Sequence, residues 1–411
     1  MYSKGKYFLF QSLLMLVSPI ASFFVALIFY KKPISQIFML IFAFYFGMHF
    51  YLANDITNHY IRMRMYYSDK SWGQILLNPD AFGNGLDYYH VVMKYLVSRI
   101  TKSREIFAGI NCLIHSAMFL FFFNQFREYY KKFLPISCGL LLLCVVFTVE
   151  FYWYQGIRFW IGVFYFGGCY LKYLNTEKKR YLLLMTVCVF FHYTLVNVLI
   201  IFIANWLLSK MWVWFRVILL GISFIYRALS VDFMGWVIKN IPGLDLGKRT
   251  VSYIHEDMLR RIVELREKAN LFYSYRSELM IVFGVIILMI FWSRRVQFSK
   301  KYLQMFFFAM TIYTVVNFAY AELIFFDRFL KIGVLLFYSF LFITACQNYD
   351  KIKGVSLIIM ILAFVPMFYA VLTPIIEMRS HLFHNELWFG NFFIDWNGGM
   401  TDYHGRWYLD E

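Results

Sequence analysis

The sequence predicts an all-α, polytopic integral membrane protein with about 10–12 transmembrane helices. Of its 411 residues, 61% are hydrophobic and only 16% are charged, and the mean hydropathy is +0.59. Apolar runs recur along most of the chain, and Lys and Arg gather in the short segments between them. A soluble fold needs more polar side chains to cover its surface. Composition therefore excludes an ordinary soluble, a disordered and a collagen-like protein.

Each predicted span is a run of about 20 mostly apolar residues. Such runs lie at about 7–30, 35–53, 105–123, 134–150, 157–173, 278–292, 302–325, 329–346 and 355–372. The first run follows Lys4 and Lys6, as the apolar part of a secretory signal would, but it is about twice as long as that part. We therefore expect it to be a retained membrane helix.

The apolar stretch 181–229 is too long for one span. Lys210 and Arg216 require the same side of the membrane as Arg180, so we expect 181–208 to enter the membrane and return. The expected break is Phe191-His192-Tyr193-Thr194. The segment 212–229 then crosses outward.

The basic residues of the short loops set the orientation, because such residues face the cytoplasm. One set of loops holds Lys31, Lys32, Arg127, Lys131, Lys132, Lys172, Lys178, Lys179, Arg180, Lys210, Arg216, Arg294, Arg295, Lys300, Lys301, Lys351 and Lys353. Its acidic residues are Glu128, Glu177 and Asp350. Topology therefore explains most of the formal net charge of +16, and no nucleic acid partner is expected.

These spans predict a single integral-membrane domain, 1–411, with extracytoplasmic segments at about 54–104, 230–277 and 373–411. In the second segment, apolar residues at helical spacing over 256–272 predict an amphipathic helix. The six cysteines lie inside apolar runs without a C-x-x-C pair, which is typical of buried side chains. No His or Cys shows metal-ligand spacing and no nucleotide motif is present, so we expect neither a metal nor a cofactor.

Ionisable groups at the outer ends of spans are candidates for function. Arg158 follows an aromatic stretch that begins at Tyr152 and a turn residue, Gly156, so we expect it in the first turn of a helix entered from the outer face. Free N–H groups and the positive end of the helix dipole favour an anion there, phosphate above all. An arginine that merely extends to the interface is the alternative.

Two later positions are further candidates. His192 lies at the expected chain reversal, where a buried break can line a cavity, although a histidine in an apolar run is often a packing residue. Arg328 also opens a helix from the outer face, and Asp327 beside it is either a functional carboxylate or its ion-pair partner.

The first outer segment carries a third group of candidates. If it is helical, Asp55 and His59 share a face, and Arg62 continues it. Arg64 lies one turn further among several tyrosines. Guanidinium groups hold phosphates and tyrosine faces stack on sugars, so this composition suits a sugar-phosphate ligand. A solvated interfacial helix is the alternative.

The order of these features resembles the bacterial exopolysaccharide and O-antigen polymerases of the Wzy-like and EpsG-like type. The resemblance covers about 40–350. It consists of the Asp-containing aromatic segment from Asp55 to Tyr67, Gly156-Ile157-Arg158 at a helix start, a basic stretch leading to a run interrupted at His192, and the late Asp327-Arg328.

The resemblance implies a membrane glycosyltransferase that joins oligosaccharide repeat units carried on undecaprenyl diphosphate, for an exopolysaccharide, capsule or O-antigen. It implies a site on the outer side of the bacterial cytoplasmic membrane, membrane lipid around the protein and a chain-length regulator as a partner. Cations would hold the diphosphate leaving group: Arg62, Arg64, Arg158 and Arg328, with His59 and Tyr152 as further ligand contacts. The base for the acceptor hydroxyl would be Asp55, His192 or Asp327.

Two other classes remain open at the level of sequence. One is a polysaccharide ligase or O-acyltransferase acting on the same glycans. The first 50 residues contain only His49, without the Arg-x-x-Arg expected for an acyltransferase. The other is a flippase or transporter for lipid-linked glycans, which favours pseudo-symmetric halves and short outer loops. No internal repeat is visible here, and the expected outer loops are long.

Overall fold

A computed structural model describes residues 4–49, 55–76, 88–130, 134–149, 158–209, 212–228, 276–318 and 324–377. Within these ranges the regular secondary structure is entirely helical, which confirms the predicted all-α class. Three described segments are long and apolar enough to cross a membrane, namely Arg104–Tyr129, Arg328–Gln347 and Tyr349–Leu372. Other apolar helices in these ranges have 10–17 residues. A membrane protein is indicated, and the count of about 10–12 spans stays a prediction.

Contacts divide the chain into two compact units, each of which is described by itself. Unit 1 comprises residues 1–125, 152–193 and 375–411, and unit 2 comprises 126–151 and 194–374. The single integral-membrane domain expected over 1–411 stays a prediction. The amphipathic helix expected at 256–272 and the outer tail lie outside the described residues.

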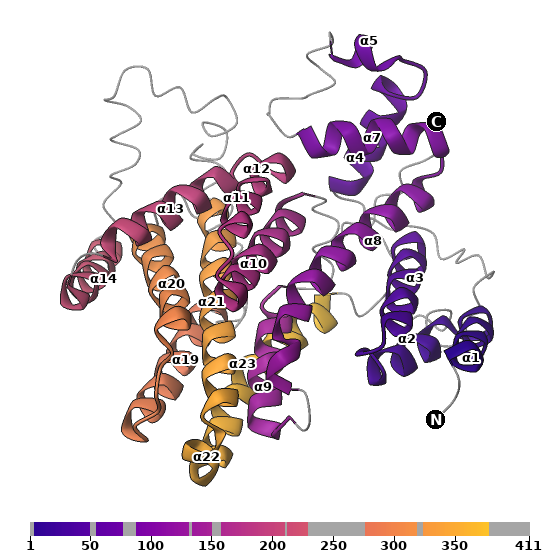
Figure 1. Ribbon diagram of the computed structural model, residues 1–411. Helices are drawn as coiled ribbons and strands as arrows, with labels where there is room; N and C mark the ends of the chain where they lie inside the picture. The colour runs from indigo at the N-terminus through magenta and orange to yellow at the C-terminus, as the bar shows by residue number, and fades with distance from the viewer. Residues whose placement is uncertain are drawn as a thin grey trace, which may run out of the picture. The chain divides into compact units, whose positions relative to one another are not determined.

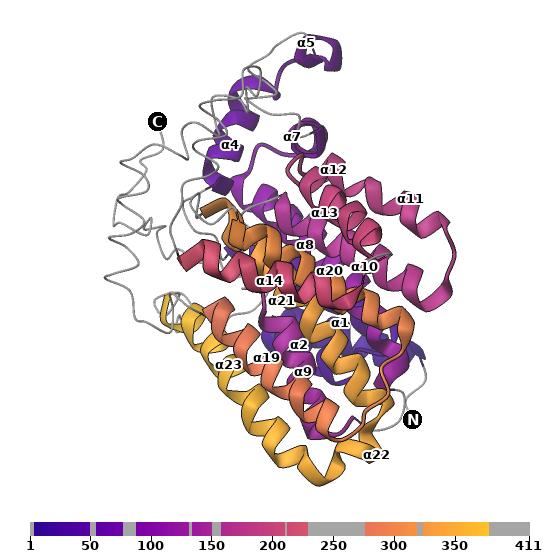
Figure 2. The same ribbon diagram turned by 90° about the vertical axis from the view of Figure 1, so that its left-hand side faces the viewer.

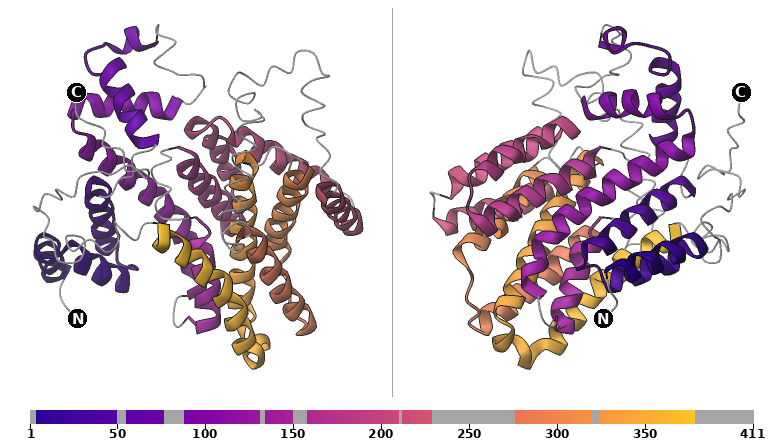
Figure 3. Two further views of the ribbon diagram at one scale, coloured as in Figure 1. Left: turned by 180° about the vertical axis from the view of Figure 1, so that it is seen from behind. Right: turned by 45° about the vertical axis from the view of Figure 1, so that its right-hand side comes forward.

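Unit 1 is built around α8, a helix whose apolar residues lie on several faces. Its described helices are α1 (Lys4–Val17), α2 (Pro19–Ile28), α3 (Pro33–His49), α4 (Asp55–Tyr66), α5 (Trp72–Leu76), α7 (Tyr88–Ile100), α8 (Arg104–Phe123), α10 (Phe159–Thr176), α11 (Arg180–Thr186) and α12 (Cys188–Phe191). Figure 3 shows α3 lying along α8, and α10 packs on another side of α8. The short helices α4, α5 and α7 lie close together at one end of this group (Figure 1).

The continuous helix expected over 7–30 is wrong. The chain breaks at Ser18, whose backbone is extended (φ −148°, ψ 91°), and α2 starts afresh at Pro19. Proline has no N–H for the preceding turn and restricts the residue before it, so the helix ends there. The Ser18 hydroxyl accepts a hydrogen bond from the Ala21 N–H at 3.4 Å and caps the new helix. Neither α1 nor α2 has the length of a span.

Glycines let α3 and α8 approach closely. A Cβ added at Gly47 would overlap the Cβ of Cys112 and lie 2.9 Å from the carbonyl oxygen of Ala108. A Cβ added at Gly109 would lie 2.9 Å from the Phe44 carbonyl oxygen. Small residues at such crossings allow backbone contact between helices in membranes.

We expect Gly47→Ala to destabilise unit 1 by about 1–3 kcal/mol, because the added methyl group separates two packed helices. Thermal unfolding of the detergent-solubilised protein measures this change. The matched control is Gly221→Ala in α14 (Val213–Ala228), where an added Cβ meets nothing within 4 Å. Alanine there should leave the transition unchanged or raise it, since it favours helix. Equal effects of both changes would contradict close packing at Gly47.

Unit 2 has α21 (Ile324–Gln347) at its centre, and most residues of this helix are buried. It lies between α9 (Ile136–Phe147) and α20 (Lys300–Phe318), as Figure 1 shows. The other described helices are the 3-10 helix Asn124–Tyr130 that leads into the unit, α13 (Leu195–Leu208), α14, α19 (Arg276–Ser293), α22 (Tyr349–Ile352), the 3-10 turn Lys353–Val355 and α23 (Ser356–Glu377).

A buried arginine joins three helices of unit 2. Arg216 of α14 is 6% exposed, and its Nε donates to the Leu208 carbonyl at 3.0 Å. Its Nη atoms donate to the side-chain and backbone oxygens of Asn205 at 3.2 and 3.4 Å. The guanidinium carbon lies 4.5 Å from the ring centroid of Phe307 on α20. Arg216 thus satisfies carbonyls at the end of α13, whereas the sequence suggested only a charge that marks the cytoplasmic side.

Candidate anion-binding site

Residues 55–66 of the segment expected to face outward form α4, which meets the condition for Asp55 and His59 to share a face, and α4 turns one face toward the rest of unit 1. Ile56 and Met63 on this face are buried in an apolar cluster with Met93 and Val97 of α7. His59 lies between them in sequence and is 6% exposed. The apolar residues of α4 thereby place an imidazole in the interior of the unit.

Polar contacts hold the C-terminal end of α4 against its neighbours. Arg99 of α7 donates to the carbonyl oxygens of Ser68 at 3.2 Å, Tyr67 at 3.3 Å and Lys70. These groups follow the last turn of α4, where helix carbonyls lack partners within the helix. The guanidinium of Arg99 therefore ties α7 to α4 and limits how His59 can move.

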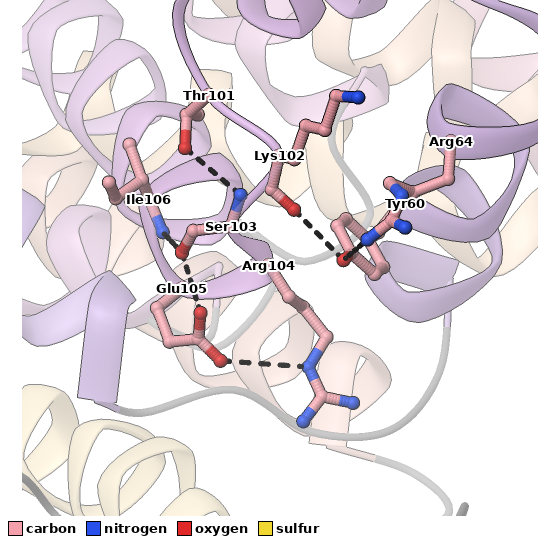
Figure 4. Close-up of polar contacts among 8 residues, drawn as sticks. All are labelled: Tyr60, Arg64, Thr101, Lys102, Ser103, Arg104, Glu105 and Ile106. Atoms are coloured by element: carbon pink, nitrogen blue, oxygen red, sulfur yellow. Dashed lines mark hydrogen bonds and ion pairs between the residues drawn. The ribbon is translucent and has the colours of Figure 1, made fainter. Parts of the chain in front are cut away.

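Arg64 has an anchoring contact on the outer side of α4. Figure 4 shows its guanidinium donating to the Tyr60 hydroxyl at 3.2 Å, and this hydroxyl donating to the Lys102 carbonyl at 3.0 Å. The same figure shows Ser103, which caps α8 by accepting from the Ile106 N–H at 3.2 Å. Arg64 is exposed, so the structure separates it from the buried face that carries His59.

Two side chains of α7 meet His59. His90 and Lys94 are one helical turn apart and are 3% and 1% exposed. The ring centroids of His90 and His59 lie 5.5 Å apart. The Nζ atom of Lys94 lies 5.7 Å from the ring centroid of Tyr67. The buried face of α7 that carries Lys94 therefore also carries the imidazole that meets His59.

Arg158 completes this group from the start of α10. It is the N-cap residue, not a first-turn residue as expected, because α10 begins at Phe159. Its side chain makes no capping hydrogen bond, and its carbonyl accepts from the Gly162 N–H at 3.2 Å. The backbone N–H groups in the first turn of this 18-residue helix, which have no acceptor within the helix, therefore follow directly after Arg158. Gly156, expected to mark the turn, lies outside the described residues.

Burial and four basic groups act on the pKa of His59. Burial lowers its pKa well below the ordinary value, and the neighbouring charges of Lys94, Arg158, His90 and Arg62 lower it further. The imidazole is therefore neutral at pH 7. Arg62 itself is exposed. Burial raises the pKa of Tyr67 to about 12, and the positive charge of Arg62 acts against this rise. We call His59, Arg62, His90, Lys94 and Arg158 the basic cluster.

The predicted break at His192 is present in the structure. α12 ends at Phe191, and His192 has an extended backbone (φ −152°, ψ 122°). The chain passes from unit 1 to unit 2 directly after this break. The His192 ring lies 5.6 Å from the ring of Phe159, next to Arg158. The structure thus brings His192 near the start of α10, and the reversal of the chain stays a prediction.

Aromatic contacts connect the same break to α7. Figure 2 shows α12 beside α7, and the ring centroids of Phe191 and Tyr89 lie 5.2 Å apart. Tyr88 stacks on Phe190 at 6.2 Å with nearly parallel rings. Burial raises the pKa of Tyr89, so its phenol keeps its proton. These contacts place α7, with His90 and Lys94, next to the segment that carries His192.

The other predicted site residues lie outside the described residues or belong to unit 2. Tyr152 and the side chains of Asp55 and Asp327 lie outside the described residues. Asp55 is the first residue of α4, one turn before His59 on the same face. Arg328 belongs to unit 2 and lies one turn inside α21, which begins at Ile324, so the expectation that it opens the helix is wrong.

Sequence reasoning did not select Lys94 and gave His90 no role. A signal existed, because Lys94 interrupts the apolar residues of 91–97 and shares its helix face with His90. An ionisable group on an apolar face of a helix indicates function or a specific partner. What the sequence lacked was the contact with α4, which depends on segments more than 30 residues apart.

The basic cluster has the chemistry of an anion site. It combines guanidinium and ammonium donors with the N-terminus of α10, and backbone N–H groups and cations are the groups that bind phosphate. Among the described residues, no group of three or more His, Cys, Asp and Glu side chains could hold a metal ion. Comparison with family models, characterised proteins and solved structures finds no match for this chain.

Proposed function

We propose that the protein is a membrane glycosyltransferase that polymerises oligosaccharide repeat units carried on undecaprenyl diphosphate. The basic cluster is the observation that carries this proposal. It places cationic and imidazole groups from α4, α7 and the start of α10 around one buried position. A diphosphate leaving group needs such donors where its negative charge develops.

The proposal includes a membrane topology. About 10–12 helices cross the bacterial cytoplasmic membrane, and the segment 54–104 with α4 and α7 lies on the outer side. The three described spans and the basic short loops support this arrangement. Lipid-linked donor and acceptor then reach the basic cluster from the outer leaflet, and a chain-length regulator acts as a partner.

The chemistry needs few protein groups because the donor is already activated. Lys94, Arg158 and Arg62 hold the diphosphate and stabilise the charge that grows on it as the glycosidic bond to the lipid diphosphate breaks. A base accepts the proton of the attacking hydroxyl, and Asp55, His192 and Asp327 are the candidates. No nucleotide sugar takes part in this transfer.

Purified full-length protein with its lipid-linked repeat unit tests the proposal. We expect a ladder of oligomers without nucleotide sugar or added metal ion. Products of single transfer to a different acceptor would instead indicate a ligase. Transfer of the lipid-linked unit between leaflets without new glycosidic bonds would indicate a flippase, and either result would reject the polymerase.

We expect Arg158→Ala to abolish polymer in cells while the protein level persists, with at least about a 100-fold loss of product. The reason is that the start of α10 loses the guanidinium that would meet the diphosphate. Gel analysis of the polymer, with immunodetection of the protein, measures both quantities. The matched control is Arg104→Ala, because Arg104 lies at the outer end of α8 in a 4.0 Å contact with Glu105. Wild-type polymer length in Arg158→Ala would remove Arg158 from the site.

A further inference from the structure

His59 is a neutral group in a position that favours anions. The charged and titratable groups that act on it come from α4 itself, from α7 and from the start of α10: Arg62, His90, Lys94 and Arg158. Helix α8, which also packs against α4, contributes the apolar side chain of Phe107 to the same core. These four groups are basic, and Asp55, one turn before His59 on the same face of α4, has a side chain outside the described residues.

Without an anion beside it, this imidazole is expected to stay uncharged. A proton on His59 would add a buried charge close to the ammonium of Lys94 and the guanidinium of Arg158. The His59 Nδ1 atom is buried and makes no hydrogen bond to another described residue. The ring thus has an unused hydrogen-bonding atom inside the basic cluster.

We propose that His59 takes up a proton from solvent when the basic cluster binds a diphosphate. The identity of the ligand rests on the proposed function, whereas the proton uptake follows from the position of the imidazole. A ligand with two or more negative charges offsets the field of Lys94 and Arg158, and the imidazolium then becomes a further donor to it. The step is a protonation only: a ring nitrogen lone pair of His59 accepts the proton, and no other bond changes.

Proton uptake makes diphosphate binding depend on pH in a defined direction. Because the bound state holds more protons, the dissociation constant falls as pH falls, by up to about tenfold per pH unit for one whole proton. This pH dependence extends over the pH range between two pKa values of His59. The lower one, without diphosphate, is well below the ordinary value, and the higher one applies when diphosphate is bound. Above this range His59 stays neutral and binding is weaker.

Titration calorimetry of the full-length protein in detergent tests this, with inorganic pyrophosphate as the probe. Measuring the binding heat at pH 7 in two buffers with different ionisation heats gives the number of protons taken up. Wild type, His59→Gln and His49→Gln are compared, so that protonation of pyrophosphate itself is common to all three. His49, the last residue of α3, lies outside the basic cluster. We expect wild type and His49→Gln to take up about half a proton or more beyond His59→Gln.

The outcomes separate this proposal from the proposed function. Equal proton uptake in wild type and His59→Gln, loss of uptake in His49→Gln alone, or no pyrophosphate binding to wild type would each overturn it. If His59→Gln does not fold, His59→Asn replaces it in the same calorimetric comparison, so that the protonation of pyrophosphate still cancels. Proton uptake without an oligomer ladder rejects the polymerase alone, and a ladder without proton uptake rejects only the protonation of His59.

Discussion

Replacing Lys94 by methionine should reduce polymer formation by about 100-fold or more, although the protein still folds. Lys94 is 1% exposed and acts directly on His59, so its ammonium group is expected to meet the diphosphate. Methionine has a flexible apolar side chain of similar length, and it preserves the packing of α7 against α4. The polymer made in cells and the oligomer ladder in vitro measure the effect.

An exposed lysine in the same segment is the control. Lys102 lies 3.8 Å from Asp69 in a contact between two exposed side chains, which contributes little to stability. Lys102→Met should leave both polymer and protein level near wild type. If Lys94→Met made polymer of normal length and amount, the buried ammonium would be structural and the anion site would lose its central cation.

Replacing Arg216 by alanine should destabilise unit 2 by about 3–5 kcal/mol, the cost of breaking up a buried network around a charge. The change removes donors from the Leu208 carbonyl and from both oxygens of Asn205. It also removes the cation–π contact with Phe307. The thermal unfolding transition of the protein in detergent should fall accordingly.

Two variants define the reason for this loss. Arg216→Lys keeps the charge but lacks the planar fork, so it should recover only part of the stability. Arg294→Ala removes an exposed arginine after α19 and should change stability by less than about 0.5 kcal/mol. An Arg216→Ala protein as stable as wild type would show that the carbonyls at the end of α13 find other partners.

The prediction of helices succeeded where the signal is local. Apolar runs around α3, α8 and α23 predict their helices to within about five residues, because each run provides the surface that the helix buries or exposes to lipid. The run expected at 302–325 extends past Phe318, where α20 ends, and reaches the start of α21. The break at His192 was also accessible, since Lys210 and Arg216 require the same side of the membrane as Arg180, so that 181–208 has to enter and return. Pro19 was an equally local signal for the helix break at Ser18, but the length of the apolar run favoured one continuous helix.

The site was only partly accessible, because contacts decide it. The sequence selects Arg62, Arg64 and Arg158 as equivalent cations. Arg64 donates to the Tyr60 hydroxyl one turn earlier on α4, and only tertiary packing brings that hydroxyl to the Lys102 carbonyl. The sequence placed Arg158 in the first turn of a helix, one residue away from its observed place as the N-cap of α10. Backbone dihedral angles determine this difference.

By itself, the sequence determined that this is an all-α, apolar chain with a break at His192, since hydrophobic runs and basic loops act over a few neighbouring residues. Only the tertiary structure decided that Lys94 and His90 join His59 and Arg158. These residues come from helices far apart in the chain, and their proximity depends on the apolar faces of α4 and α7 packing together. Burial at that junction is also what keeps His59 neutral, because removing water disfavours the charged imidazole among basic groups.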